Sequence, residues 1–253
     1  MNEDESPQQA RAQLEAARRQ LQLLTDAITH DLRAPLRTIE GFATRIAASA
    51  HERLDERERE QLQRVRDAAT RMNALLEELG ELSRATHAPL QMGDVDISLF
   101  AEWILSDLQA GEPDRPARLH VQPGLSVRGD ERLLRLLLAQ LLHNAWKFSV
   151  GATETCIEVT GTRDGPVLRV EVRDQGIGFE PRYLHKIFEP LQRLHRMEEG
   201  AGHGLGLAIA QRVAMRHGGT ITAASRPGDG ATFTVELPGS GEGSSDEGSP
   251  HAA

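Results

Sequence analysis

Long apolar runs, cysteine pairs and a surplus of positive charge are all missing from this 253-residue sequence. No apolar run approaches the roughly 18 residues of a membrane span, and the best block, 133–142, is interrupted by Arg135 and Gln140. The single cysteine, Cys156, cannot form an internal disulfide, which fits a reducing compartment. The net charge of −9 argues against a nucleic-acid partner. The first residues, MNEDESPQQA, do not resemble a signal peptide, so we expect a cytoplasmic protein without a membrane span.

Two long helical patterns occupy the N-terminal third. The first extends from about residue 8 to 50, apart from Pro35 and Gly41, and the second follows the charged turn AHERLDERERE. Steps of three and four between apolar residues indicate a coiled-coil seam in each run. Its members are Leu14, Ala17, Leu21, Leu24 and Ile28 in the first run, and Leu62, Val65, Ala69, Met72, Leu76 and Leu79 in the second. We predict an antiparallel hairpin that pairs with a second copy as a four-helix bundle; a plain coiled-coil stalk remains open at this point.

The pattern changes near Ala88-Pro89, where short β-like runs begin to alternate with helical runs at about 98–109, 131–147 and 204–217. Strands that are partly adjacent and partly separated by helices favour an α/β sandwich, and thus an α+β chain overall. We therefore predict a polar tail and coiled-coil helix over 1–24, a hairpin domain over 25–87 and an α/β-sandwich domain over 88–238. The residues 239–253 lack apolar content and should be disordered.

Three segments of the second domain suggest nucleotide chemistry. In LLAQLLHNAWKFS, the side chains of Gln140, Asn144 and Lys147 share one helix face, where amide oxygens and an ammonium suit a Mg²⁺–phosphate group. In VRDQGIGFEP, a strand ends at Asp174, whose carboxylate could accept a hydrogen bond from an exocyclic amine. In GAGHGLGLAIAQ, glycines precede a helix and could form an anion cradle. Each segment alone is better explained as ordinary structure. A lid is expected over the roughly 25 residues between the last two segments.

Other phosphate-binding families lack support in the sequence. Neither lysine, Lys147 or Lys186, stands in a Walker A motif. There is no HRD and DFG pair of a eukaryotic-type protein kinase, and the glycine-rich segment does not open an N-terminal βαβ unit.

Five motifs, in the order THDLRAPL, LLHNAWKFS, RDQGIGF, KIFEPLQRLH and GHGLGLAI, resemble the H, N, G1, F and G2 boxes of sensor histidine kinases. The resemblance covers about residues 20 to 238 and is closest to the kinase modules of phytochrome-like sensors. It implies a dimerisation and phosphotransfer hairpin followed by an ATP-binding domain of the Bergerat (GHKL) type. It also implies ATP and Mg²⁺ as cofactors, a homodimer, a response-regulator receiver domain as partner, and an upstream sensor domain or sensor protein.

The resemblance assigns roles to individual residues. His30 would be the phosphoacceptor and become phosphohistidine, while Asp31 would hold or accept the proton of one imidazole nitrogen. His30 lies about 200° around the helix from Ile28 and should face solvent. The residues assigned to ATP are Asn144, Lys147, Asp174, Gly176, Gly178, Phe188, Arg193, Gly202, Gly204, Leu205 and Gly206. Asn144 would bind Mg²⁺, with Gln140 left open as a second ligand.

Two departures from the family pattern change what is expected. Gln140 stands where asparagine is common, which puts that part of the metal shell in doubt. Ala34 stands where strong phosphatases of the family carry threonine or asparagine, so we predict weak phosphatase activity. The leading hypothesis is an ATP-dependent protein-histidine kinase that phosphorylates His30 and passes the phosphoryl group to a response-regulator aspartate. The alternatives are a catalytically weak dimeric scaffold of the same fold, and a serine kinase or ATPase that shares only the nucleotide pocket.

Overall fold

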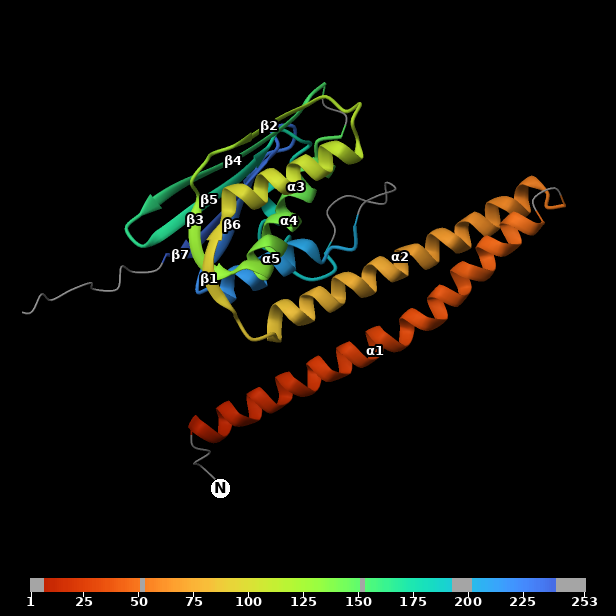
Figure 1. The fold of residues 1–253 in the computed structure, drawn as a ribbon, viewed down its shortest axis with the longest axis horizontal. Helices are drawn as coiled ribbons and strands as arrows, with labels where there is room; N and C mark the ends of the chain where they lie inside the picture. Colours follow the sequence, from red (N-terminus) through yellow and green to blue (C-terminus); the bar gives the residue numbers. More distant parts are fainter. Residues whose placement is uncertain (1–6, 51–52, 151–152, 193–201, 240–253) are drawn as a thin grey trace, which may run out of the picture. The chain divides into compact units, whose positions relative to one another are not determined.

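The computed structural model describes residues 7–50, 53–150, 153–192 and 202–239, in two compact units, Met1–Pro89 and Leu90–Ala253 (Figure 1). None of the helices in these ranges combines the length and the hydrophobicity of a transmembrane span. Arg193 and the tail from residue 240 onward lie outside the described residues, as does part of the expected lid.

The first unit is the predicted antiparallel hairpin of α1 (Pro7–Ser49) and α2 (Glu56–His87). Helix α1 continues through Pro35. Helix α2 begins with a capping box: Asp55 accepts a hydrogen bond from the Glu58 amide at 2.7 Å, and the Glu58 carboxylate accepts one from the Asp55 amide at 2.9 Å. These two bonds satisfy amides that have no partner inside the helix, so Asp55 is the N-cap and α2 begins at Glu56.

Leu24 and Ile28, the last two members of the seam predicted for α1, are 51% and 53% exposed in the single chain, so α2 does not cover them. The residues of α1 that are buried against α2 are instead Thr29, Leu36 and Ala43, which recur every seven positions. An apolar stripe therefore stays uncovered on α1, and it consists of Leu24, Ile28, Leu32, Ile39, Phe42 and Ile46. Periodicity alone did not show that α2 covers the adjacent face, which contains Thr29, Leu36 and Ala43, rather than this stripe.

The second unit is an α/β sandwich. Its five-stranded sheet has the order β2-β4-β5-β7-β6, in which β2 is parallel to β4 and every other pair is antiparallel. The strands are β2 (Ala117–Val121), β4 (Thr155–Asp164), β5 (Val167–Asp174), β6 (Thr220–Ser225) and β7 (Ala231–Pro238). A separate antiparallel pair joins β1 (Met92–Asp96) to β3 (Ser126–Asp130), and β3 was not predicted from the sequence.

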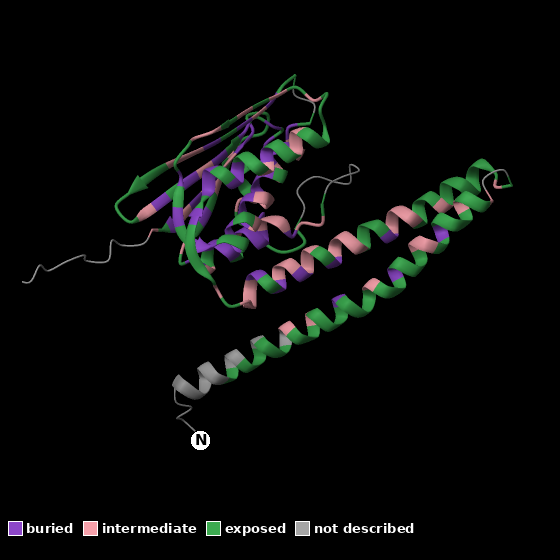
Figure 2. Cartoon of the chain, viewed as in Figure 1, coloured by how far each residue is buried: buried purple, intermediate pink, exposed green. Residues whose placement is uncertain are grey.

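Helices α3 (Ile97–Gly111), α4 (Glu131–Phe148) and α5 (Gly206–Arg216) cover one face of this sheet (Figure 1). A short 3₁₀ helix, η1 (Pro181–Tyr183), follows β5. The core lies between the two layers, where the leucines of α4 meet alternate residues of β5 and β7 (Figure 2). Burial alternates along β5, as expected for a sheet with one covered face.

Asp130, which is fully buried, joins three parts of the second unit. Its carboxylate caps α4 by accepting from the Leu133 amide at 3.2 Å, and it also accepts from the Gln91 amide at 2.7 Å. Its own amide donates to Nε2 of His217 at 2.9 Å, at the end of α5. The carboxylate thus fixes the N-terminus of α4 against the entry of the chain into this unit.

We expect Asp130→Asn to lower the free energy of unfolding of the second unit by about 1–3 kcal/mol at pH 7. Burial favours the protonated carboxyl, but the Gln91 amide and the Arg132 guanidinium outweigh it and lower the pKa of Asp130. The ionised group therefore stabilises the fold above its ordinary pKa of about 3.9, and this contribution is lost as pH falls through the lower folded value. Tryptophan fluorescence in urea measures the effect, because Trp103 and Trp146 both lie in this unit. If wild type and Asp130→Asn differ in free energy of unfolding by the same amount at pH 7 and at pH 3, the ionised carboxylate of Asp130 does not provide this stability.

Candidate functional site

The polar face of α4 begins the candidate site. Gln140, Asn144 and Lys147 are half-buried on this face, as the helical spacing predicted. The opposite face holds the helix in the core through leucines that are at most 2% exposed: Leu134, Leu137, Leu138, Leu141 and Leu142. The helix therefore has little freedom to rotate, and its three polar side chains keep one direction.

Asp174 ends β5 and is 4% exposed. Its Oδ1 accepts two backbone hydrogen bonds, from the Gly176 amide at 2.9 Å and the Ala231 amide at 3.2 Å. Burial raises the pKa of Asp174, and the two amide donors oppose that effect. Both hydrogen bonds are made to Oδ1, so they orient the carboxylate without involving Oδ2.

The glycines after Asp174 are required by close backbone contacts. A Cβ on Gly176 would lie 2.3 Å from the Phe148 carbonyl oxygen. Gly178 has φ +61°, and a Cβ there would lie 2.1 Å from the Arg226 carbonyl oxygen. Gly230, with φ +75°, approaches the Asp174 backbone in the same way. Side chains at these positions would push the loop off both α4 and the β6–β7 turn.

A backbone hydrogen bond connects this glycine loop to α4: the Ile177 amide donates to the Phe148 carbonyl at 3.0 Å. Phe148 is the last residue of α4, one position after Lys147. The polar face of α4 and Asp174 are thus held together by main-chain contacts. Sequence reasoning missed Phe148 and Ala231 in this site, because a backbone carbonyl or amide leaves no signature in the residue type.

The glycine-rich start of α5 meets the same face of α4. The position of a Cβ on Gly202, which has φ +43°, lies 3.2 Å from Nζ of Lys147. A Cβ on Gly206 would lie 2.5 Å from Oε1 of Gln140. Gly204, with φ +77°, approaches the backbone of Gln192. The structure therefore brings together the N, G1 and G2 segments that the sequence had separated by up to 66 positions.

Other predicted residues lie differently. Leu205 is 2% exposed, so its side chain belongs to the core and only its backbone can face a ligand. In the segment after η1, Ile187 is the buried side chain, while Phe188 is half-buried. Phe188 lines a groove of about 620 Å³ between residues 184–190, α5 and β6. Asn144, Lys147 and Asp174 do not line that groove, so it is separate from the candidate site.

His30 lies in the first unit, and its side chain is 86% exposed, as the helical geometry predicted. Its Nδ1 lies 3.2 Å from Oδ1 of Asp31, which is itself 82% exposed. A carboxylate only accepts hydrogen bonds, so a bond in this contact requires the neutral tautomer with the proton on Nδ1, in which Nε2 carries the lone pair.

Comparison with known proteins gives the family of both units. Residues 20–88 match the His Kinase A (phospho-acceptor) domain, and residues 129–241 match the histidine kinase-, DNA gyrase B- and HSP90-like ATPase. The chain therefore belongs to the sensor histidine kinases, with a phosphoacceptor hairpin followed by a GHKL ATPase domain.

The chain is similar to several curated relatives. It is 34% identical to the sensor-like histidine kinase SenX3 of Mycobacterium tuberculosis over 248 residues, which are 96% of this chain and 59% of SenX3. It is 31% identical to the phosphate regulon sensor protein PhoR of Pseudomonas aeruginosa, over 83% of this chain and 48% of PhoR. It is 27% identical to the phytochrome-like protein Cph1 of Synechocystis, over 89% of this chain and 30% of Cph1. The chain thus spans less than two thirds of each.

Solved structures show the same fold. Full-length ShkA matches with a TM-score of 0.65 at 24% identity, over 85% of this chain and 45% of ShkA. The mycobacterial sensor histidine kinase MprB matches with a TM-score of 0.50 at 27% identity, over 59% of this chain and 98% of the solved chain.

Proposed function

We propose that this chain is an ATP-dependent protein-histidine kinase that phosphorylates His30 and passes the phosphoryl group to an aspartate of a response regulator. The observation that carries the proposal is the convergence of α4, Asp174 and the glycine-rich start of α5 in one unit, while the other unit presents an exposed imidazole. The family to which the chain belongs supports the same activity.

In this proposal, the adenine and the phosphates of ATP are bound by different parts of the site. The fixed carboxylate of Asp174 accepts a hydrogen bond from the adenine amine. Because burial raises its pKa, acidification would remove this acceptor sooner than for an exposed aspartate. Lys147 and the glycine amides at the start of α5 bind the phosphates. Asn144 holds Mg²⁺, and Gln140 is a further candidate ligand; the ion would neutralise phosphate charge in the transferring group.

The proposed acceptor chemistry uses the tautomer of His30 in which Nδ1 carries the proton. Nε2 attacks the γ-phosphorus, an N–P bond forms, and the bond to the β–γ bridging oxygen breaks, so that ADP leaves with the electron pair. The positive charge that develops on the imidazole is relieved when Nδ1 releases its proton to Asp31. In the second reaction, a receiver-domain carboxylate displaces the imidazole.

The proposal includes three partners or activities. The uncovered apolar stripe on α1 supports a homodimer, because six large apolar side chains recur on one helix face at spacings of three, four and seven residues. The share of each relative that the chain spans supports a sensor domain in the remainder of a longer protein or in another chain. Weak phosphatase activity follows from Ala34, whose methyl group cannot orient a water molecule.

Labelled ATP should transfer its γ-phosphoryl group to the wild-type chain and not to His30→Gln. The linkage should be labile in acid and stable in base, as expected for a phosphoramidate. Asp31→Asn should slow labelling about 100-fold, the lower end of the contribution of a positioned general base. An acid-stable label would support a serine kinase, and binding of ATP without any label would support the scaffold.

Sedimentation should give the wild-type chain a mass of about twice 27.8 kDa. Phe42→Glu should produce monomers, because Phe42 lies in the uncovered stripe and is 55% exposed in the single chain. Thr44→Glu is the matched control: it adds the same charge on another face of α1 and should leave the dimer intact. A wild-type monomer, or equal dissociation by both variants, would contradict the pairing.

Ala34→Thr should increase dephosphorylation of the phosphorylated response regulator, with autophosphorylation of His30 retained. The hydroxyl lies one helical turn after His30 and can orient a water molecule. The release of inorganic phosphate from the regulator measures the gain. An unchanged rate of release would show that this position does not limit phosphatase activity here.

A further inference from the structure

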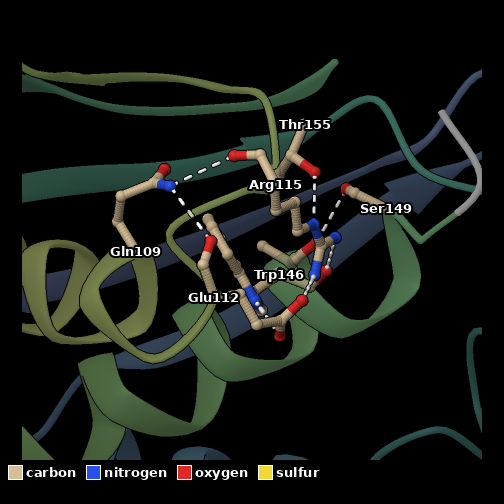
Figure 3. Close-up of polar contacts among 7 residues, drawn as sticks. Gln109, Glu112, Arg115, Trp146, Ser149 and Thr155 are labelled. Carbon is tan, nitrogen blue, oxygen red and sulfur yellow. Dashed lines mark hydrogen bonds and ion pairs between the residues drawn. The ribbon is translucent and has the colours of Figure 1, made fainter. Parts of the chain in front are cut away.

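Arg115 lies between α3, β4 and the last turn of α4, outside the candidate site (Figure 3). Its guanidinium donates to the Trp146 carbonyl at 2.5 Å and to the Thr155 hydroxyl at 2.9 Å, and it pairs with Glu112 at 3.3 Å. It also stacks over the Trp146 ring, 4.3 Å from the centroid. The side-chain amide of Gln109, in α3, donates a hydrogen bond to the backbone carbonyl of Arg115 at 3.1 Å.

These contacts use properties that only arginine combines. The planar fork donates in two directions while its face stacks on the indole, and a cation at the C-terminus of α4 is favoured by the helix dipole. The Trp146 indole completes the cluster by donating to Glu112 at 2.9 Å. That hydrogen bond, with the charge of Arg115, lowers the pKa of Glu112. The side chain of Arg115 is only 13% exposed, so its contacts are shielded from competing water.

The cluster ends where the candidate site begins. Trp146 precedes Lys147, and the Phe148 carbonyl accepts the hydrogen bond from Ile177 in the glycine loop. The last turn of α4 is therefore held from two sides: Arg115 binds its Trp146 carbonyl, and the loop after Asp174 binds its Phe148 carbonyl. A shift of this turn would move Lys147 and the glycine loop together, and Asn144 one turn earlier along the same helix.

We propose that Arg115 is a positioning residue for the Mg²⁺–phosphate part of the nucleotide site, which it supports through the last turn of α4 without touching the ligand. This inference rests on the proposed ATP binding. It assigns a functional consequence to a charged residue that none of the sequence motifs includes.

Binding of ADP to the whole chain, titrated with Mg²⁺, tests the proposal. Arg115→Met should raise the half-saturating Mg²⁺ concentration about tenfold, the lower end of the effect of groups that orient metal ligands. For Arg115→Lys, the half-saturating Mg²⁺ concentration should lie between those of wild type and Arg115→Met. Lysine can still donate to the Trp146 carbonyl, but it cannot form the two-directional fork of arginine. Arg118→Met, which removes an arginine that is 71% exposed, should match wild type.

A second control separates positioning from loss of stability. Asp130→Asn weakens the opposite end of α4, so it should lower stability while leaving the Mg²⁺ midpoint near the wild-type value. If Asp130→Asn raises the midpoint as much as Arg115→Met, or if Arg115→Met leaves it unchanged, Arg115 has no positioning role. If the wild-type chain binds no ADP, the proposed function itself is wrong.

Discussion

The attachment of the glycine loop to the end of α4 is the contact on which the nucleotide unit depends. One hydrogen bond, from the Ile177 amide to the Phe148 carbonyl, joins the helix that carries Asn144 and Lys147 to the strand that ends at Asp174. The same approach requires a glycine at 176, where a Cβ would lie 2.3 Å from that carbonyl oxygen. The polar face of α4 and the carboxylate of Asp174 are therefore placed by a main-chain contact rather than by direct side-chain pairing.

Burial contributes in a different way to the two units. In the second unit, the leucines of α4 are closed into a core that fixes the helix, and the polar groups at its two ends are satisfied by Asp130 and Arg115. In the hairpin, one face of α1 is covered by α2, while the stripe that includes Ile28 and Phe42 is not. His30 belongs to neither face: it follows buried Thr29, yet its own side chain is 86% exposed.

Much of the site could be predicted because its chemistry lies in side chains at helical or strand spacing. The face of Gln140, Asn144 and Lys147 and the strand end at Asp174 follow from residue order alone, as does the exposure of His30. The pattern did not show which of two adjacent faces of α1 is covered by α2, the one with Ile28 or the one with Thr29. It was also silent on contacts made by backbone atoms, such as those of Phe148. It missed Arg115 as well, because two of the partners of its guanidinium come from distant elements, α4 and β4.

Amide hydrogen exchange at Ile177 in the nucleotide-free chain tests most directly whether this wall of the site exists before ATP binds. The structure predicts slow exchange, comparable to that of the buried strand residue Val172, because the Ile177 amide is committed to the Phe148 carbonyl. Exchange at the rate of an unstructured peptide, with protection only after nucleotide is added, would show that the ligand assembles the site and would contradict this account.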